Sequence, residues 1–273
     1  GDFRGKYKPG AAKDAYTAFT WAAPWKQTSY AVLFRPVLDN TRVVHHWLLF
    51  EDDAPGGTPG PGYVEAGIHP NALLIAAWVP GQDPIDLRVP GHDVGLELRA
   101  DTTYTLEVHY NSDDANAEDA SGVEVCTVNR KPANIASYSW LGWENLSFPS
   151  DHWTGVCNPN YAQGPIHVIS IVPHMHLKGR HAKVTVQRAD GGIESLHDAP
   201  FDFAYERLYQ TDLTLYPGDS VKTDCHYSEP KLYGPQTTEE MCYVFTMAYP
   251  RGALSSADFV GSLLHGGGTC FGQ

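Results

Sequence analysis

Short apolar and alternating segments, separated by turn-forming residues, make up most of the chain. There is neither a long apolar pattern with helical periodicity nor an internal repeat. Segments rich in β-branched and aromatic residues, bounded by Gly, Pro, Asp and Ser, are typical of strands. We expect strands at 29–35, 43–50, 72–79, 103–110, 123–128, 167–172, 182–187, 211–215 and 242–248, with turns or loops at PGGTPGPG, PGQDP, ADGG and YPGDS.

The pattern predicts an all-β protein built from antiparallel β-sandwiches. A polar, acidic segment, NSDDANAEDA at 111–120, interrupts the strands near the middle of the chain. The parts on either side have roughly 110 and 150 residues, each a normal size for a sandwich domain. We therefore predict domains at 1–116 and 117–273. The alternative is that 111–120 is a long surface loop within one domain.

Composition supports this interpretation and excludes some partners. The 273 residues are 42% hydrophobic and only 19% charged, with 26 Gly, 20 Pro, 15 Tyr and 7 Trp, which favours many short strands. The formal net charge of -13 argues against nucleic acid and anionic membrane surfaces as partners. No apolar run approaches the roughly 18 residues of a membrane span. The chain opens with GDFRGKYKPG, which is no signal peptide, so we interpret it as a mature or trimmed form.

Three histidine motifs stand out among the 13 histidines. His45 and His46 are adjacent at the head of an apolar strand, so both reach one ion only at a strand end or edge. His109 is a single histidine on a strand, which is usually a buried, hydrogen-bonded core residue. His174 and His176 flank Met175, and an i, i+2 pair on a strand shares one face, close enough for one metal.

Sulfur groups bear on the choice of metal and on the compartment. A thioether beside two imidazoles selects copper(I) over zinc, and either Met241 or Met247 can supply it on pattern alone. Met175 points away from its two histidines, so we interpret it as a core residue. The five cysteines contain no CxxC pair, and two disulfides with one free thiol indicate an oxidising compartment.

At these residues the sequence resembles the copper type II, ascorbate-dependent monooxygenases, including peptidylglycine α-hydroxylating and dopamine β-monooxygenases. The matching segments occur in the family's order and with similar spacing over most of the chain. They are VVHHWLLF (43–50), LEVHY (106–110), IHVISIVPHMHLKG (166–179) and TEEMCYVF (238–245). The HMHLKGR run looks closer to the dopamine branch.

The resemblance implies two β-sandwich (jelly-roll-like) domains that face each other across a cleft, each with one copper. By the same resemblance His45, His46 and His109 bind the electron-transfer copper. The catalytic copper, which binds dioxygen and substrate, takes His174, His176 and Met241. The implied disulfides are Cys157–Cys270 and Cys225–Cys242, which leaves Cys126 free. The first domain lacks the disulfides of the family's animal members.

The function so implied is hydroxylation of a C–H bond with dioxygen and ascorbate or another one-electron reductant. A secreted, non-catalytic copper-binding or copper-buffering sandwich is the alternative. The sequence contains no GxSxG, Walker A, GxGxxG or HExxH motif of other enzyme classes. We expect a secreted, periplasmic or secretory-vesicle protein.

The substrate class is inferred from three positions aligned with the family's motifs. By the same resemblance, the peptide-amidating members of the family hold the terminal carboxylate of their substrate with an Arg two residues before the HxH motif. This chain has Val172 there, and it has Tyr243 and Phe245 after the methionine ligand. Valine cannot make the bidentate bonds by which Arg holds a carboxylate. We therefore expect a neutral or aromatic small-molecule substrate, unless another strand supplies the clamp.

Overall fold

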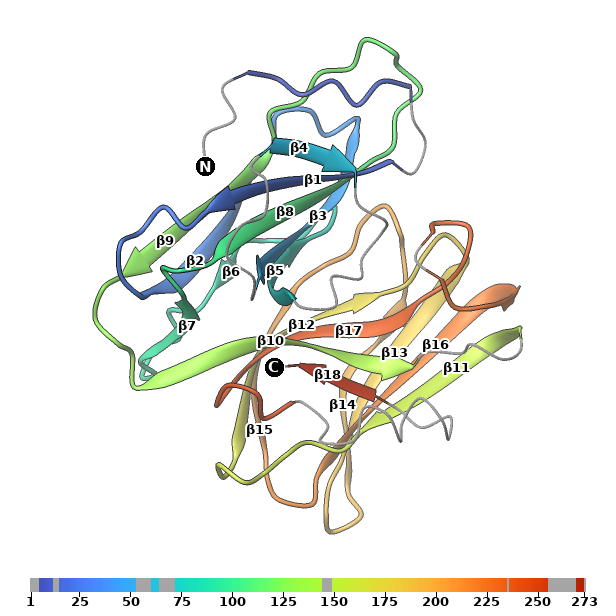
Figure 1. Cartoon of the computed structure of the whole chain (residues 1–273). Coiled ribbons are helices and arrows are strands. Elements are labelled where there is room, and N and C mark those ends of the chain that lie inside the picture. The colour runs from blue at the N-terminus through green and yellow to red at the C-terminus, as the bar shows by residue number, and fades with distance from the viewer. Residues whose placement is uncertain are drawn as a thin grey trace. The chain divides into compact units, whose positions relative to one another are not determined.

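The computed structural model describes residues 5–11, 15–52, 60–63, 72–143, 149–234, 236–254 and 269–272. The regular elements of these described residues are all β-strands, and the strand pairs within each unit are antiparallel (Figure 1). This confirms the all-β prediction. The chain divides into two compact units, Gly1–Asn134 and Ile135–Gln273.

The first unit contains two groups of strands. One sheet has the order β4–β1–β8–β3–β5. In the other group β2 pairs with β6, β7 and β9. The bounds are β1 Ala15–Ala22, β2 Ser29–Val37, β3 Val44–Asp52, β4 Gly60–Tyr63, β5 Ala72–Trp78, β6 Ile85–Asp86, β7 Val94–Leu98, β8 Thr103–Tyr110 and β9 Gly122–Val128.

Strand β8 lies in the middle of the first sheet, between β1 and β3. All eight of its residues are buried, including the polar Glu107 and His109. A strand with a neighbour on each side and covered faces leaves no position open to water, whatever the residue type. The position of β8 therefore buries His109 completely.

The second unit is a sandwich of two sheets. One has the order β15–β12–β17–β10, with β18 also paired to β10, and the other has the order β11–β16–β13–β14. Val168 of β12, Val244 of β17 and Val184 of β13 belong to one buried apolar cluster, so the two sheets share this core. The bounds are β10 Asn134–Trp143, β11 Ser150–Cys157, β12 Ile166–His174, β13 Gly179–Gln187, β14 Ile193–Pro200, β15 Tyr209–Leu215, β16 Ser220–Lys231, β17 Cys242–Tyr249 and β18 Thr269–Gly272.

The structure places two segments that the sequence analysis expected to be connections. The PGGTPGPG segment was expected to be a loop, but its end forms β4, which pairs with β1 at the edge of the sheet. An edge strand tolerates proline because one side of its backbone needs no partner strand. The polar segment at 111–120 joins β8 to β9, and β9 pairs with β2, so both flanking strands belong to the first unit.

Candidate metal centres

Three histidines converge at the start of β3 and the end of β8. The ligand atoms of His45, His46 and His109 all lie within 4.8 Å of one another, a grouping that no other His, Cys, Asp or Glu triplet of the described residues reaches. His109 is fully buried and its ring stacks on Tyr16 at 4.2 Å between centroids, with the planes 2° apart. His45 and His46 are partly buried.

A β-bulge brings the two adjacent histidines to the same place. Val44 pairs with Tyr110 and His46 pairs with His109, so His45 is an additional residue on β3 that has no counterpart on β8. A bulge of this kind bends the strand and redirects a side chain that would otherwise point to the opposite face. The Nδ1 atoms of His45 and His46 are consequently only 3.0 Å apart.

This arrangement fits a transition-metal ion. Such an ion holds imidazole nitrogens at about 2.0–2.1 Å, so two bound nitrogens are at most about 4 Å apart. The separation of His45 and His46 already satisfies this limit, and the third imidazole needs only a small movement. Neutral imidazoles are donors that suit copper.

The second predicted pair, His174 and His176, lies at the end of a strand. His174 is the last residue of β12, and His176 follows in the turn before β13. Both are buried, and their rings meet edge to face at 5.4 Å between centroids. Met175 is fully buried in a cluster with Trp153 and the Cys225–Cys242 pair, which confirms that it is a core residue.

The segment before β17 is hydrogen-bonded to the His176 turn. The backbone amides of His176 and Lys178 donate to the Glu240 carboxylate at 2.7 and 2.6 Å. Burial raises the pKa of Glu240 to about 7, against the lowering effect of these amides. Met241 follows directly, and its carbonyl accepts a hydrogen bond from Tyr227 at 2.8 Å. The two bonds to the Glu240 carboxylate therefore hold the residue just before Met241 beside the histidine turn.

Glu206, which the sequence analysis did not identify, contacts one of the predicted metal ligands. It lies in the loop between β14 and β15, is buried, and its Oε2 is 2.8 Å from Nδ1 of His174. Burial lowers the pKa of His174 to about 4, so its imidazole is neutral at neutral pH, and burial raises the pKa of Glu206. A carboxylate on one ring nitrogen orients the other toward a metal. The only sequence signal is the aromatic-rich run FDFAYER, in which Glu206 is one of two acids.

The three expected substrate residues lie beside His174. Val172 and Phe245 are paired on β12 and β17, and Tyr243 is paired with His174. All three are buried, and the Phe245 ring is 5.1 Å from the His174 ring. Trp140 of β10, which the sequence analysis did not identify, contacts both aromatic rings at 5.5–5.6 Å. These residues form an aromatic wall next to His174.

Met247 differs from Met241 in its surroundings. It is fully buried within β17 and pairs with Ser170 and Tyr138 on the neighbouring strands. The structure thus gives Met247 a packing position inside the sheet, whereas Met241 lies before the strand and directly after Glu240, whose carboxylate is hydrogen-bonded to the histidine turn.

The cysteines agree with the predicted pairing wherever they are described. Cys225 and Cys242 form a disulfide with a Cα–Cα distance of 5.8 Å, as predicted. Cys126 is a free thiol, and Cys157 is disulfide-bonded. The side chain of Cys270, its predicted partner, lies outside the described residues.

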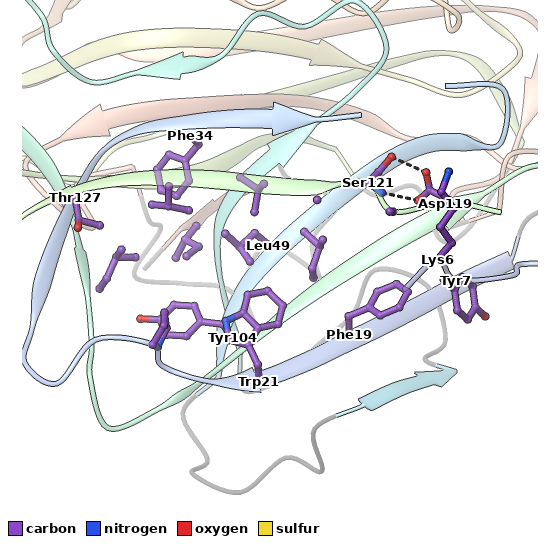
Figure 2. Close-up of a pocket in the computed structure, with 18 of the residues that line it drawn as sticks. Lys6, Tyr7, Phe19, Trp21, Phe34, Leu49, Tyr104, Asp119, Ser121 and Thr127 are labelled. Carbon is purple, nitrogen blue, oxygen red and sulfur yellow. Dashed lines mark hydrogen bonds between the residues drawn. The ribbon is translucent and has the colours of Figure 1, made fainter. Parts of the chain in front are cut away.

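A cavity of about 600 Å³ lies inside the first unit, between the strands of its two groups (Figure 2). Phe34, Leu49 and Tyr104 form part of its wall, and Asp119 and Ser121 are hydrogen-bonded to each other near one end. None of the predicted metal ligands is among the described residues that line it.

The chain is similar to a family model and to several curated monooxygenase-like proteins. Residues 147–258 match the family model described as copper type II ascorbate-dependent monooxygenase, C-terminal domain. DBH-like monooxygenase protein 1 of Gallus gallus is 30% identical over 250 residues, which cover 78% of this chain and 40% of the relative. The Homo sapiens protein of the same name is 27% identical, with 83% and 43% covered. MOXD1 homolog 1 of Drosophila melanogaster is 27% identical, with 77% and 36% covered.

The chain thus spans less than half the length of these relatives. The described residues contain no helix long and apolar enough to cross a membrane. The matched C-terminal domain includes the His174 and His176 motif, and the relatives' alignments extend over most of the chain. From the family model and the relatives together, the chain belongs to the copper type II ascorbate-dependent monooxygenase family.

Proposed function

We propose that this protein is a copper-dependent monooxygenase, which hydroxylates a C–H bond of a small molecule with dioxygen and ascorbate or another one-electron reductant. The observation that carries the proposal is the gathering of His45, His46 and His109. Three buried or partly buried imidazoles at one point have no packing role that apolar residues would not fill better.

Each histidine group would hold one copper. His45, His46 and His109 would bind the electron-transfer copper, and His174, His176 and Met241 the copper at which dioxygen and substrate meet. When bound, copper supplies one-electron redox chemistry and, with a thioether among its ligands, a preference for the reduced state. Two coppers per chain is the stoichiometry proposed.

The protein's own contribution is to hold these donors in place. The Tyr16 ring keeps the His109 imidazole in one plane, and the pairing of β3 with β8 fixes His46 opposite it. Glu206 orients His174 through Nδ1, which leaves Nε2 for the metal. Low mobility of ligands means that little reorganisation accompanies each change of oxidation state.

The substrate would contact Val172, Tyr243 and Phe245. These side chains offer an apolar and aromatic surface, with no cation to hold a carboxylate, so a neutral or aromatic compound with a benzylic or similarly weakened C–H bond suits them. Positioning the reacting carbon next to the His174 site is the main catalytic task of this wall.

Metal analysis of the purified chain, followed by an assay with ascorbate and oxygen, tests the proposal. We expect close to two coppers per chain, and oxygen consumption coupled to a hydroxylated product. Two coppers without turnover would point to a copper-binding protein instead. Absence of copper would contradict both the monooxygenase proposal and the copper-binding alternative.

A pair of substrates tests the proposed specificity. A phenethylamine-like compound should be hydroxylated, and a glycine-extended peptide should not. Phe245→Leu should raise KM for the aromatic substrate, while Met247→Leu, a buried change on the same strand, should leave KM unchanged. Efficient turnover of the peptide alone would refute the substrate proposal.

The compartment follows from the thiol chemistry. A disulfide such as Cys225–Cys242 forms and persists where the environment is oxidising. We therefore propose that the protein is secreted, periplasmic or contained in the lumen of a secretory vesicle.

A further inference from the structure

A row of three histidines crosses the outer face of the second unit's four-stranded sheet. His226 of β16 lies between two neighbours, with His152 of β11 paired to it on one side and His181 of β13 on the other. Residues directly opposite each other in a sheet project from the same face, with Cβ atoms about 4.5–5.5 Å apart. The three imidazoles therefore belong to one surface, and none of them is part of the copper sites proposed above.

The rings are close together and accessible. His152 and His226 stack at 4.1 Å between centroids with their planes 5° apart, and the His181 ring is 6.1 Å from that of His226. The side chains of His152 and His181 are 47% and 36% exposed, and His226 is exposed. The alternate residues of these strands, such as Trp153, Ala182 and Cys225, face inward and form a buried cluster. The histidines thus have no role in that core.

Carboxylates lie at both ends of the row. Asp224 Oδ1 is 3.5 Å from Nε2 of His152, and Asp198 Oδ1 is 3.1 Å from Nε2 of His181. Asp224 also accepts from Thr154 at 2.5 Å and pairs with Lys222 at 2.9 Å, while Asp198 pairs with Lys183 at 2.7 Å. Lysines already compensate these two charges. A metal ion bound at this row would therefore take its donor atoms mainly from the imidazoles, and the carboxylates would orient the rings.

We propose that His152, His226 and His181 form a surface site for a divalent transition-metal ion of the zinc, nickel or copper(II) type. Imidazole nitrogen is the donor these ions share, and an ion held by two or three cross-strand imidazoles links β11, β16 and β13. The rings must turn to bind, since among the described residues only the His45 group brings three ligand atoms within 4.8 Å. Exposed side chains change rotamer within nanoseconds, so this rearrangement is open to them.

The electrostatics of the central residue favour the neutral ring that a metal needs. The pKa of His226 lies below its ordinary value, first because its neighbours remove part of the hydration of the ring and then because His152 and His181 would repel its charge. His226 also belongs to both cross-strand pairs, whereas each neighbour belongs to one. The proposal therefore ranks the three residues: loss of His226 breaks every pair, and loss of either neighbour leaves one.

Retention of the untagged full chain on immobilised Ni²⁺ tests the site, because a resin reaches only surface imidazoles. We expect wild type to be retained, His226→Asn to pass through, and His152→Asn and His181→Asn to elute at intermediate imidazole concentrations. His92→Asn, a histidine of the first unit, should behave as wild type. His45→Ala with His46→Ala should also be retained, which separates this site from the proposed copper site.

Zn²⁺ titration of the copper-loaded chain gives a second readout. Loss of an outer-shell partner alone weakens metal sites 10- to 100-fold, so His226→Asn should weaken Zn²⁺ binding by about tenfold or more. Circular dichroism confirms that each variant is folded, and the double change His152→Asn with His181→Asn replaces His226→Asn if that variant does not fold. Equal retention and equal Zn²⁺ affinity of wild type and His226→Asn would overturn the proposal, as would failure of wild type to bind either metal.

Discussion

The two predicted metal-binding histidine groups are built in different ways. In the first unit, strand pairing brings the histidines together: β3 and β8 place His46 opposite His109, and a bulge adds His45. In the second unit, His174 and His176 sit where β12 ends, and carboxylates from elsewhere in the chain, Glu206 and Glu240, hold them and their turn. Sheet register positions the ligands of the first group, whereas residues from elsewhere in the chain orient those of the second group.

Removing one ligand from each group is the change with the largest expected effect. His109→Ala should abolish copper binding at the first group and lower activity by more than ~100-fold, since ligand loss exceeds the effect of an outer-shell partner. Carbon monoxide should still bind copper(I) at the second group. His176→Ala should reverse this pattern. Copper analysis and infrared spectroscopy of the carbonyl measure both. Equal loss of carbon monoxide binding in the two variants would show that the histidines do not form two separate sites.

The two methionines of the second unit give the next largest contrast. Met241→Leu should lower activity by roughly 100-fold, because the proposed soft ligand is lost, with little change in stability. Met247→Leu should retain activity and cost less than about 1.5 kcal/mol, since it conserves volume at a buried position. Steady-state kinetics and thermal unfolding of both variants make the comparison. The opposite outcome, with Met247→Leu inactive and Met241→Leu active, would exchange the ligand assignment.

Glu206 tests whether the second group depends on an orienting carboxylate. Glu206→Gln should weaken copper binding at the second group or lower activity by about 10- to 100-fold, and leave the copper of the first group in place. Glu229→Gln, a surface glutamate of the same unit, is the control. If Glu206→Gln binds two coppers as tightly as wild type and keeps full activity, the carboxylate has no positioning role.

The smallest expected effect concerns the acid sensitivity of the fold at Asp219, which lies outside both histidine groups. Burial alone would raise the pKa of Asp219, but hydrogen bonds from the Tyr216 amide, the Arg188 guanidinium and the Ala189 amide outweigh it, so the pKa is lowered. A lowered pKa contributes stability above the unfolded-state value of about 3.9, and this stability is lost as pH falls through the folded-state pKa.

Asp219→Asn should therefore destabilise the protein by about 2 kcal/mol at pH 7, the usual scale for hydrogen bonds to a charged group. The difference from wild type should shrink below about pH 4. Urea unfolding at several pH values measures it. A difference that stays constant down to low pH would mean that the Asp219 charge does not contribute.

Local pattern was sufficient to locate many strands. The expected segments at 103–110 and 242–248, for example, correspond to β8 and β17, with bounds that differ by at most one residue. Strands of mixed polarity were not predicted: β16 carries Lys, Asp and His on its outer face, and β14 is exposed along most of its length. Their position in the sheet, and not their apolar content, makes them strands.

The sequence by itself determined the all-β class and the histidines at issue, because these depend on residue types and spacings within short segments. The family and the Cys225–Cys242 disulfide were expected from the resemblance of several ordered segments to known proteins. Tertiary structure decided the rest. Which residue faces which across a sheet depends on register, and register joins residues far apart in the chain: His46 to His109, and His152 to His226 to His181. The bulge at His45, the carboxylate of Glu206 beside His174 and the exposed histidine row all follow from such pairings or from long-range packing, for which no local pattern exists.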